Sequence, residues 1–418
     1  FNRIFSLRKE ENKKMNTILG ELGKSKKFVE LIKNIEEKQS PIGISGLSNV
    51  GMLETIASIN EYTKKPIAII TYNEIQAKWI MENIQFFTDK AMYFPKTDIA
   101  TYDFVAESKD LPYARIEALN KLNSKRNYIF VTTIEAAMQK LPAKELLYKN
   151  ILKFKVGEVH SLDQIKQDLV NLGYTRCDLI EGRGQFSLRG GILDISINDA
   201  IGVRIEFWGD EIDSIRNFNI VSQRSINALE KVEIEPAHEY ILEKPIEEIC
   251  KKVRKTIAND LQEDIIEQDI EQIKAGNYIS KIDKYFDCFY DKQETVIDYL
   301  NQNSIITFDE IRKIEQRAQN VIKDNDNLIK NLIEKGKVVP QAISNIQSFS
   351  SIEKLVEESK KVTIYIEKQD NKIDRQAQNY NFSYRAINYF KSEIETLFTD
   401  IRKAQEQGKN IYVVVATK

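Results

Sequence analysis

The chain has few of the residues that metal centres and disulfide frameworks need. Its 418 residues include two histidines, His160 and His238, and three cysteines, Cys177, Cys250 and Cys288. The cysteines lie far apart without C-x-x-C spacing, so structural zinc and disulfide pairing are disfavoured, and a reducing cytoplasmic setting is expected. Two histidines are too few for a histidine-based metal site. No metal site is therefore predicted.

The chain also lacks an excess of charge of one sign and a long apolar run. The 61 basic and 63 acidic side chains give a net charge of −2, so no global basic field attracts nucleic acid, although a local basic patch would be compatible with this balance. No apolar run approaches the ~18 residues of a membrane span, and the first residues do not form a signal peptide. We expect a globular protein of two to four domains, with no membrane partner.

The two ends of the sequence suggest a piece of a longer protein. Met15 could be a natural start, with residues 1–14 lying upstream of it. The last residues, "NIYVVVATK", form a β-branched run that predicts a buried strand. We therefore expect a fragment.

Alternating strand and helix patterns predict a parallel α/β sheet. "PIAIITY" (66–72) is a short apolar run typical of a strand buried on both faces, and "NEIQAKWIMENIQFF" after it has helical spacing, with Asn73 as its expected cap. "YIFVTTIEAAMQKL" (128–141) repeats this order, as do residues 41–62. "SIITFDE" (304–310) predicts another buried strand, followed by a long helix at about 309–337.

The middle of the chain has a different pattern. From about 151 to 235, short alternating strands with tight turns surround one helix near 161–172, which predicts a small inserted α+β domain. Residues 240–300 are helical and charged in composition. "VTIYIE" predicts a later strand, and the polar stretch 368–381 predicts a linker.

"GISGLSNV" (43–50) has the strand-turn-helix pattern of a phosphate-binding loop. Such a loop needs glycines, a lysine for the terminal phosphates and a Ser or Thr hydroxyl for Mg²⁺. If the loop starts at Gly43, the second glycine position falls on Ser48, the lysine position on Asn49 and the hydroxyl position on Val50.

A start at Gly46 meets the glycine spacing through Gly51, but Met52 and Leu53 then occupy the lysine and hydroxyl positions. Both registers thus lack the lysine and the metal-binding hydroxyl. Because the positive charges of the lysine and of Mg²⁺ stabilise the transferred phosphoryl group, ATP hydrolysis should be lost. No cofactor is expected for this chain. Two alternatives remain: a turn that caps an ordinary helix, or residual anion binding at the helix N-terminus.

"FDE" (308–310) ends a predicted strand with two carboxylates, which in this kind of fold orient Mg²⁺ and water. The alternative is an ordinary strand end whose carboxylates face solvent or cap the helix that follows at Ile311. Without the lysine we expect the second.

Three segments of the insert resemble a known family: "GYTRCDLIEGRGQFSLRGGILDISI" (173–197), "VRIEFWGDEIDSIRNFNIVSQRS" (203–225) and "EPAHEY" (235–240). Together with "PKTDIATYDFVAESKDLPYARIEAL" (95–119) and "GISGLSNV", they are similar to the N-terminal, UvrB-homology module of the bacterial transcription-repair coupling factors (Mfd). The resemblance is specific from about 40 to 240.

The resemblance implies a RecA-like parallel-sheet domain with a degenerate nucleotide loop and an inserted small α+β domain. The expected parts are an N-terminal extension (1–24), the first part of the RecA-like domain (25–150), the inserted UvrA-binding-like domain (151–235), the second part of the RecA-like domain (236–345) and the start of a further small α/β domain (346–418).

The alternative is a UvrB-like, ATP-dependent, damage-verifying DNA helicase. UvrB retains a lysine-containing loop and a Tyr-rich β-hairpin before the insert. Here "VTTIEAAMQKLPAKELLYKNILKFKV" runs from helix to insert without room for that hairpin. Both absences favour the coupling factor.

The resemblance also implies which surface would recruit UvrA. Where UvrB has a further arginine, this chain has Ser187. Phe186, next to it, is either a core residue or a contact. The candidate partner-binding residues are Arg176, Phe186, Arg189, Arg204 and Glu206.

Strand alternation supports that surface independently. In "VRIEF", Val203, Ile205 and Phe207 share one face, whereas Arg204 and Glu206 share the other. Arginines on a rigid, solvated sheet face suit bidentate pairing with carboxylates of a partner. The alternative is that these are ordinary exposed charges, which rarely contribute binding energy.

The expectation is therefore a non-catalytic adaptor, not an enzyme, that recruits UvrA to stalled RNA polymerase in nucleotide excision repair. The resemblance implies that RNA polymerase and double-stranded DNA bind regions of the parent outside this chain. It further implies that ATP and Mg²⁺ bind a missing C-terminal motor, and that the C-terminal part of the parent contacts this module.

Overall fold

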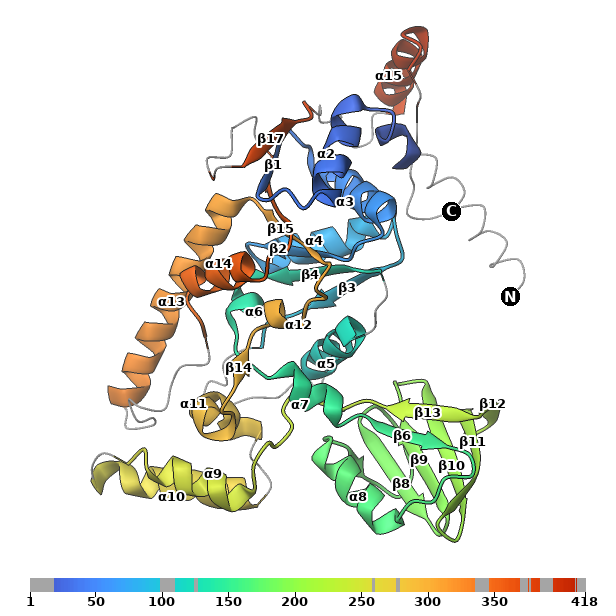
Figure 1. Cartoon of the computed structure of the whole chain (residues 1–418), viewed down its shortest axis with the longest axis vertical. Helices are drawn as coiled ribbons and strands as arrows, with labels where there is room; N and C mark the ends of the chain where they lie inside the picture. Colours follow the sequence, from blue (N-terminus) through green and yellow to red (C-terminus); the bar gives the residue numbers. More distant parts are fainter. Residues whose placement is uncertain are drawn as a thin grey trace.

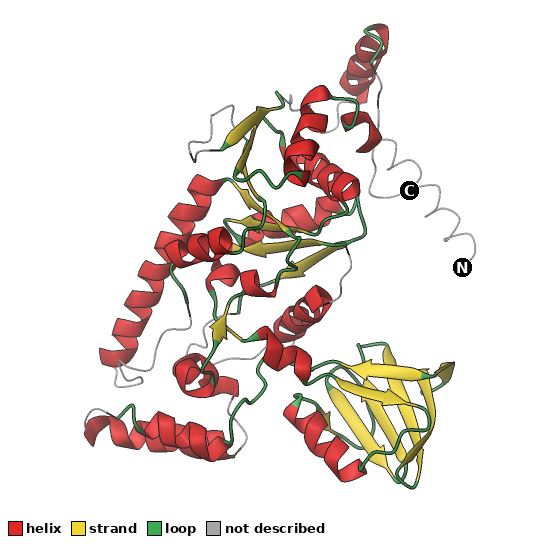
Figure 2. Ribbon diagram, in the orientation of Figure 1, coloured by secondary structure: helices red, strands yellow, loops and turns green. Residues whose placement is uncertain are grey.

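The computed structural model describes residues 19–97, 110–123, 127–257, 260–275, 279–334, 346–368, 375, 377–383, 394–409 and 411. The predicted final strand, the first residues around Met15 and most of the central part of the 95–119 segment lie outside these ranges. Figures 1 and 2 show two main bodies, an α/β domain and a smaller β-rich insert.

A seven-stranded parallel sheet forms the centre of the α/β domain, in the order β17-β1-β16-β15-β2-β4-β3 (Figure 1). Every neighbouring pair in this sheet is parallel. Its strands are β1 (Ile42–Ser45), β2 (Ile67–Thr71), β3 (Ala91–Phe94), β4 (Ile129–Thr133), β15 (Ile305–Asp309), β16 (Thr363–Glu367) and β17 (Gln378–Asn381).

Helices cover both faces of this sheet because its strands are apolar on both sides. In β4, Ile129 and Val131 pack in the cluster that includes α2 (Lys26–Glu36), α3 (Asn49–Thr63) and α4 (Glu74–Ile84). Phe130 packs on the opposite face, in a cluster with helices α5 (Asp110–Asn123), α6 (Ile134–Met138), α12 (Val296–Tyr299), α13 (Ile311–Glu334) and α14 (Phe349–Glu358). The predicted α/β class, a parallel sheet covered by helices with a separate small insert, is confirmed.

The caps that start these helices follow from local sequence. The side chain of Asn73 accepts a hydrogen bond from the Gln76 amide at the start of α4, as predicted. Ser48 does the same for α3 by accepting from the Gly51 amide. Each cap satisfies an amide that has no partner inside the helix.

The structure differs from the predicted boundary at residue 346. β16 and β17 do not begin a separate small domain; β16 lies between β1 and β15, and β17 pairs with β1. The physical reason is burial, because the apolar side chains of "VTIYIE" fill a central position that β1 and β15 leave open. Sequence order alone gave no sign of this crossover.

The insert is a six-stranded mixed sheet, in the order β12-β11-β10-β9-β8-β7, with one helix on its inner face (Figure 1). Phe186, Val203 and Ile205 on that face are buried in the same apolar cluster as Ile165 and Leu169 of the helix. The elements are β6 (Leu152–Lys155), α8 (Leu162–Asn171), β7 (Thr175–Arg176), β8 (Gln185–Arg189), β9 (Ile192–Ser196), β10 (Ile201–Trp208), β11 (Glu211–Asn219), β12 (Ser225–Leu229) and β13 (Lys231–Ile234). β6 and β13 form a two-stranded ribbon where the chain enters and leaves the insert.

The remaining elements are β5 (Leu141–Pro142), α7 (Lys144–Lys149), α9 (Ile246–Arg254), α10 (Asp260–Lys274), α11 (Ile279–Phe289), β14 (Gln293–Glu294) and α15 (Ile394–Glu406). Of these, α15 lies at the end of the molecule away from the insert (Figure 1). In the described ranges, no helix has both the length and the apolar character needed to cross a bilayer. Among the same residues, no group of three or more His, Cys, Asp or Glu side chains is arranged to hold a metal.

Candidate functional site

The phosphate-loop-like segment turns tightly between β1 and α3. Gly46 has a φ of +70°, a conformation that suits glycine, and Ser48 caps the helix that begins at Asn49. Val50, at the hydroxyl position of the first register, is 56% exposed. A Cβ on Gly46 would lie 2.8 Å from Oδ1 of Asn381, so the last residue of β17 lies close to the turn.

Further contacts hold the end of β17 and the next residue against the loop and against α2. The amide of Phe382 donates to the carbonyl oxygen of Ser45 at 3.0 Å, and the ammonium of Lys27 donates to the carbonyl of Asn381. Gly43 lies inside β1, in register with Tyr365 and Asn379. The end of β17 and the residues after it therefore lie beside the turn at Gly46 that precedes α3.

The carboxylates of "FDE" do not face solvent as expected. Asp309 is fully buried, and its Oδ2 accepts from Gln76 Nε2 at 2.9 Å and from Thr71 Oγ1 at 3.1 Å. Its Oδ1 accepts no hydrogen bond from the residues that the structure describes, and it lies 3.7 Å from the ammonium of Lys368. Burial raises the pKa of the Asp309 carboxyl. Because Asp309 ends a central strand of the sheet, tertiary packing encloses it.

Glu310 is also enclosed, between two cations. Its Oε2 lies 2.6 Å from Lys313 Nζ and 3.3 Å from Lys368 Nζ. Lys368 thus reaches both carboxylates from the end of β16, which is the strand beside β15. Lys368 therefore attracts both carboxylates electrostatically.

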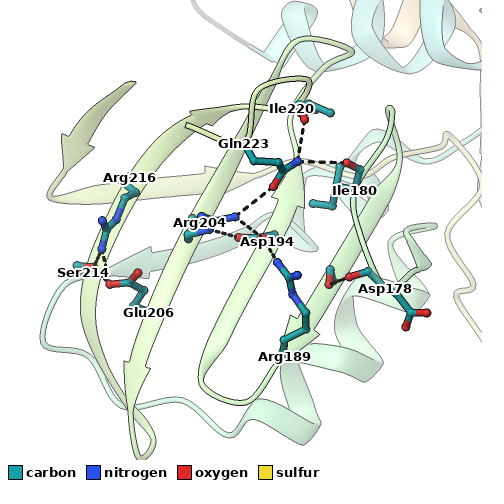
Figure 3. A network of polar contacts seen from close by, with 11 residues as sticks. Asp178, Ile180, Arg189, Asp194, Arg204, Glu206, Ser214, Arg216, Ile220 and Gln223 are labelled. Atoms are coloured by element: carbon teal, nitrogen blue, oxygen red, sulfur yellow. Dashed lines mark hydrogen bonds and ion pairs between the residues drawn. The ribbon is translucent and has the colours of Figure 1, made fainter. Parts of the chain in front are cut away.

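The outward face of the insert sheet holds a network of polar side chains (Figure 3). Arg204 and Glu206 point to this face from β10, as the alternation predicted, since Val203, Ile205 and Phe207 point into the core. Asp194 lies directly opposite Arg204 in the β9–β10 ladder.

Arg204 is bound within the sheet and is not free for a partner. Its Nε donates to Asp194 Oδ1 at 2.7 Å, and its Nη2 donates to Oδ2 at 2.8 Å. The guanidinium also lies over the Phe218 ring, 4.7 Å from its centroid. Hydrogen bonding to Asp194 raises the pKa of Arg204. The bidentate pairing expected with a partner carboxylate is thus formed inside the chain.

Glu206, also on β10, is paired inside the chain with two residues of the neighbouring strand β11. Its Oε2 accepts a hydrogen bond from Arg216 Nη2 and another, at 2.9 Å, from Ser214 Oγ. Arg189, by contrast, is 53% exposed in its side chain and has one longer contact, at 3.3 Å, with Asp194. Arg189 is therefore the member of the predicted set on this face whose guanidinium is most accessible.

Two further candidates do not join this face. Phe186 is fully buried and packs in the core, so its side chain cannot touch a partner in this conformation. Arg176 is exposed on the edge strand β7, but its ladder partner is Phe186, so it is in register with the inward face. Ser187 is buried and donates to the carbonyl of Asp178.

Four residues of this face were not predicted from the sequence: Asp194, Phe218, Gln223 and Trp208. Gln223 accepts from Arg204 at 3.3 Å and donates to the carbonyl of Ile220, which closes the network at one end. The signal for Asp194 was present, since it alternates with Leu193 and Ile195 in "ILDIS". Strand register was needed to place it opposite Arg204.

A buried ion pair joins the insert to the α/β domain. Nε of Arg115, on α5, donates to both carboxylate oxygens of Glu239 at 2.8 and 3.0 Å. Its Nη1 donates to the carbonyl of Pro95 and to Gln139 Oε1, and the guanidinium lies 4.1 Å from the centroid of the Phe94 ring. Glu239 belongs to the segment by which the chain leaves the insert, so this cluster fixes that exit.

Comparisons with known proteins agree with this architecture. Residues 152–240, which span the insert and its exit, match the family described as the UvrB interaction domain. The chain is 29% identical over 366 residues to the transcription-repair-coupling factor of Bacillus subtilis, covering 84% of this chain and 31% of the relative. It is 28% identical over 391 residues to that of Staphylococcus aureus (90% and 33%) and over 396 residues to that of Staphylococcus epidermidis (91% and 33%).

The chain therefore spans about a third of the length of the curated relatives it matches. The match covers the sheet domain as well as the insert. The comparisons confirm the resemblance stated from the sequence: this chain is similar to the N-terminal, UvrB-homology module of the transcription-repair-coupling factors.

Proposed function

We propose that this chain is a non-catalytic adaptor that recruits UvrA in transcription-coupled nucleotide excision repair. In the proposal, the insert binds UvrA, while RNA polymerase and double-stranded DNA are bound by parts of a longer parent protein. The observation on which the proposal depends is the match of residues 152–240 to the UvrB interaction domain, together with the rigid polar face that this segment presents.

The geometry of that face supports a docking role. A sheet whose outward charges are already paired holds its shape before a partner arrives, so little conformational entropy is lost on binding. Arg189 remains exposed beside the paired network and can turn its guanidinium to a partner carboxylate. Arg204 and Glu206 then act as supports for the surface, through Asp194 and Arg216.

We also propose that the turn between β1 and α3 does not support ATP hydrolysis. Neither possible register supplies the lysine and the hydroxyl that phosphoryl transfer needs. Lys368 lies between Asp309 and Glu310, which supports the view that the acids are neutralised internally. The contacts of the end of β17 and of Phe382 with the loop further favour a structural turn.

Binding of purified UvrA to residues 1–418, measured by calorimetry, tests the adaptor proposal. We expect a stable complex, and about tenfold weaker binding for Arg189→Ala with unchanged thermal unfolding. Lys153→Ala is the matched control, because Lys153 is an exposed cation of the insert, on the entry ribbon and off the network face. The adaptor proposal is rejected if the unaltered chain does not bind UvrA.

A phosphate-release assay with and without DNA tests the proposal that the turn between β1 and α3 does not support ATP hydrolysis. We expect no ATP turnover by this chain. Turnover that is stimulated by DNA would favour the alternative, a UvrB-like ATP-dependent helicase.

A further inference from the structure

Trp208 is the last residue of β10 and is 85% exposed. It follows Phe207, which points into the core, so its indole lies on the same outward face as Arg204 and Glu206. Large aromatic side chains are normally buried, and this one projects from a rigid strand end. Its exposure is therefore a feature of the surface that needs a physical reason.

A glycine turn lies beside the indole on one side. The β8–β9 turn at Gly190 and Gly191 runs alongside the end of β10, and the amide of Phe207 donates to the carbonyl of Gly191 at 2.7 Å. By alternation from the pair Ile192–Glu206, Gly191 shares the inward side of Phe207, where a Cβ would lie 2.7 Å from the Phe207 carbonyl oxygen. Gly190, which precedes it in the turn, has no side chain that could cover the ring of Trp208.

Two other apolar side chains extend this exposed area. Ile192, which is 38% exposed, lies opposite Glu206 in the ladder, and Arg189 lies opposite Ile192. On the other side, Trp208 pairs with Glu211, and Glu211 in turn bridges to Val159, which is 71% exposed. Cross-strand partners point to the same side of a sheet, so these residues form one continuous outward area.

This area has the composition of a binding hot spot. Tryptophan and arginine dominate hot spots, and paired charges around them serve mainly to exclude water. Arg204 and Glu206 are such internally paired charges, whereas Trp208 has the largest side chain that docking could bury. The patch is continuous with the face of the matched UvrB interaction domain, which identifies the partner of that domain as its occupant.

We propose that Trp208 is the anchor of this docking surface, flanked by Ile192 and Val159, and that it enters an apolar pocket of the partner next to a carboxylate that receives Arg189. The inference rests on the proposed function, in which that partner is UvrA. It assigns the main binding energy to an aromatic side chain and leaves Arg204 and Glu206 as supports of the surface.

Binding of Trp208→Ala to purified UvrA tests the inference. We expect the dissociation constant to rise at least about 30-fold, as for other truncated hot-spot residues, with Trp208→Phe retaining part of the affinity. Thermal unfolding should not change, because the side chain packs against little. Val221→Ala is the matched control: Val221 is an 88% exposed apolar residue of the same insert, just beyond β11 at the other end of the β10–β11 hairpin.

A spectroscopic measurement gives an independent readout. The chain has two tryptophans, so the Trp79→Phe variant leaves Trp208 as its single tryptophan. UvrA binding should shift its emission to shorter wavelength and protect it from acrylamide, once the signal of UvrA alone is subtracted. Binding by the unaltered chain, with Trp208→Ala within threefold of it or with no protection of Trp208, overturns the inference and leaves the adaptor proposal intact. No binding by the unaltered chain overturns both.

Discussion

Asp194 and Arg204 face each other across the β9–β10 ladder, with Oδ1 2.7 Å from Nε and Oδ2 2.8 Å from Nη2. The Asp194 side chain is almost fully buried, whereas the Arg204 side chain is 19% exposed. Alternation in the sequence places Arg204 on a solvated face, but its pairing with Asp194 makes it a structural residue of the sheet. Its substitution should change stability before it changes recognition.

Arg204→Ala should lower the free energy of unfolding by about 2–4 kcal/mol, because Asp194 then loses its main partner while still buried. Urea unfolding followed by circular dichroism measures this loss. Arg189→Ala is the control; its guanidinium is half exposed, and its removal should cost less than about 0.5 kcal/mol. Equal stability of the two variants would contradict a structural role for Arg204.

Arg115→Met should destabilise the protein by about 3–5 kcal/mol, since Glu239 would remain buried without its cation. Chemical unfolding measures the change, and limited proteolysis near residues 235–240 should reveal loosening at the exit of the insert. Lys121→Met is the matched control on the same helix, because its ion pair with Glu117 is exposed and should contribute little. Adding Glu239→Gln to Arg115→Met should recover part of the loss.

Asp309→Asn should raise the free energy of unfolding at pH 7. Burial raises the pKa of this carboxyl, so the native state holds its proton more tightly than the unfolded chain does. Native stability therefore falls as pH rises from about 4, the unfolded value, through the native pKa. The advantage of Asn should shrink as pH is lowered towards 4, as measured by urea unfolding at several pH values.

Asp163→Asn provides a comparison, because the pKa of Asp163 is shifted in the opposite direction to that of Asp309. The hydrogen bond from Lys166 lowers the pKa of Asp163, so this carboxylate contributes stability that is lost at low pH. Its substitution should not stabilise the protein at pH 7. If Asp309→Asn destabilises the protein at pH 7 as well, the account of its burial is wrong.

His238 should make stability depend on pH in the acidic range. Burial lowers its pKa to about 4, against 6.5 for an ordinary histidine, so between these values only the unfolded chain binds the proton. Stability should then fall by about 2–3 kcal/mol as pH drops from 6.5 to 4.

Close packing around the His238 ring accounts for the burial that lowers its pKa. The ring of His238 packs on Gly173, where a Cβ would lie 2.0 Å from the nearest ring atom, and its Nδ1 accepts from the Tyr240 amide. His238→Asn should abolish the pH-dependent loss, whereas His160→Gln, at the other histidine of the chain, should retain it. Nuclear magnetic resonance titration of the two rings gives the direct check, and a pKa near 6.5 for His238 would contradict the prediction.

Local patterns in the sequence determined much of the architecture. Apolar runs predicted β2, β4 and β15, because strands covered on both faces must be apolar throughout. Asn73 was predicted as a cap because the residues after it have helical spacing and the first amides of a helix need an acceptor. Alternation in "VRIEF" correctly separated the core side chains from Arg204 and Glu206. These features depend on residues close together in the chain.

Only the tertiary structure decided which distant residues meet. It placed β16 between β1 and β15, enclosed Asp309 beside Lys368, and set Asp194 opposite Arg204. Strand order and register are long-range choices, made by the burial of many side chains at once, and no local period specifies them. The sequence alone thus determined the elements and their inward faces, whereas the fold determined which charges are paired internally and left Trp208 uncovered.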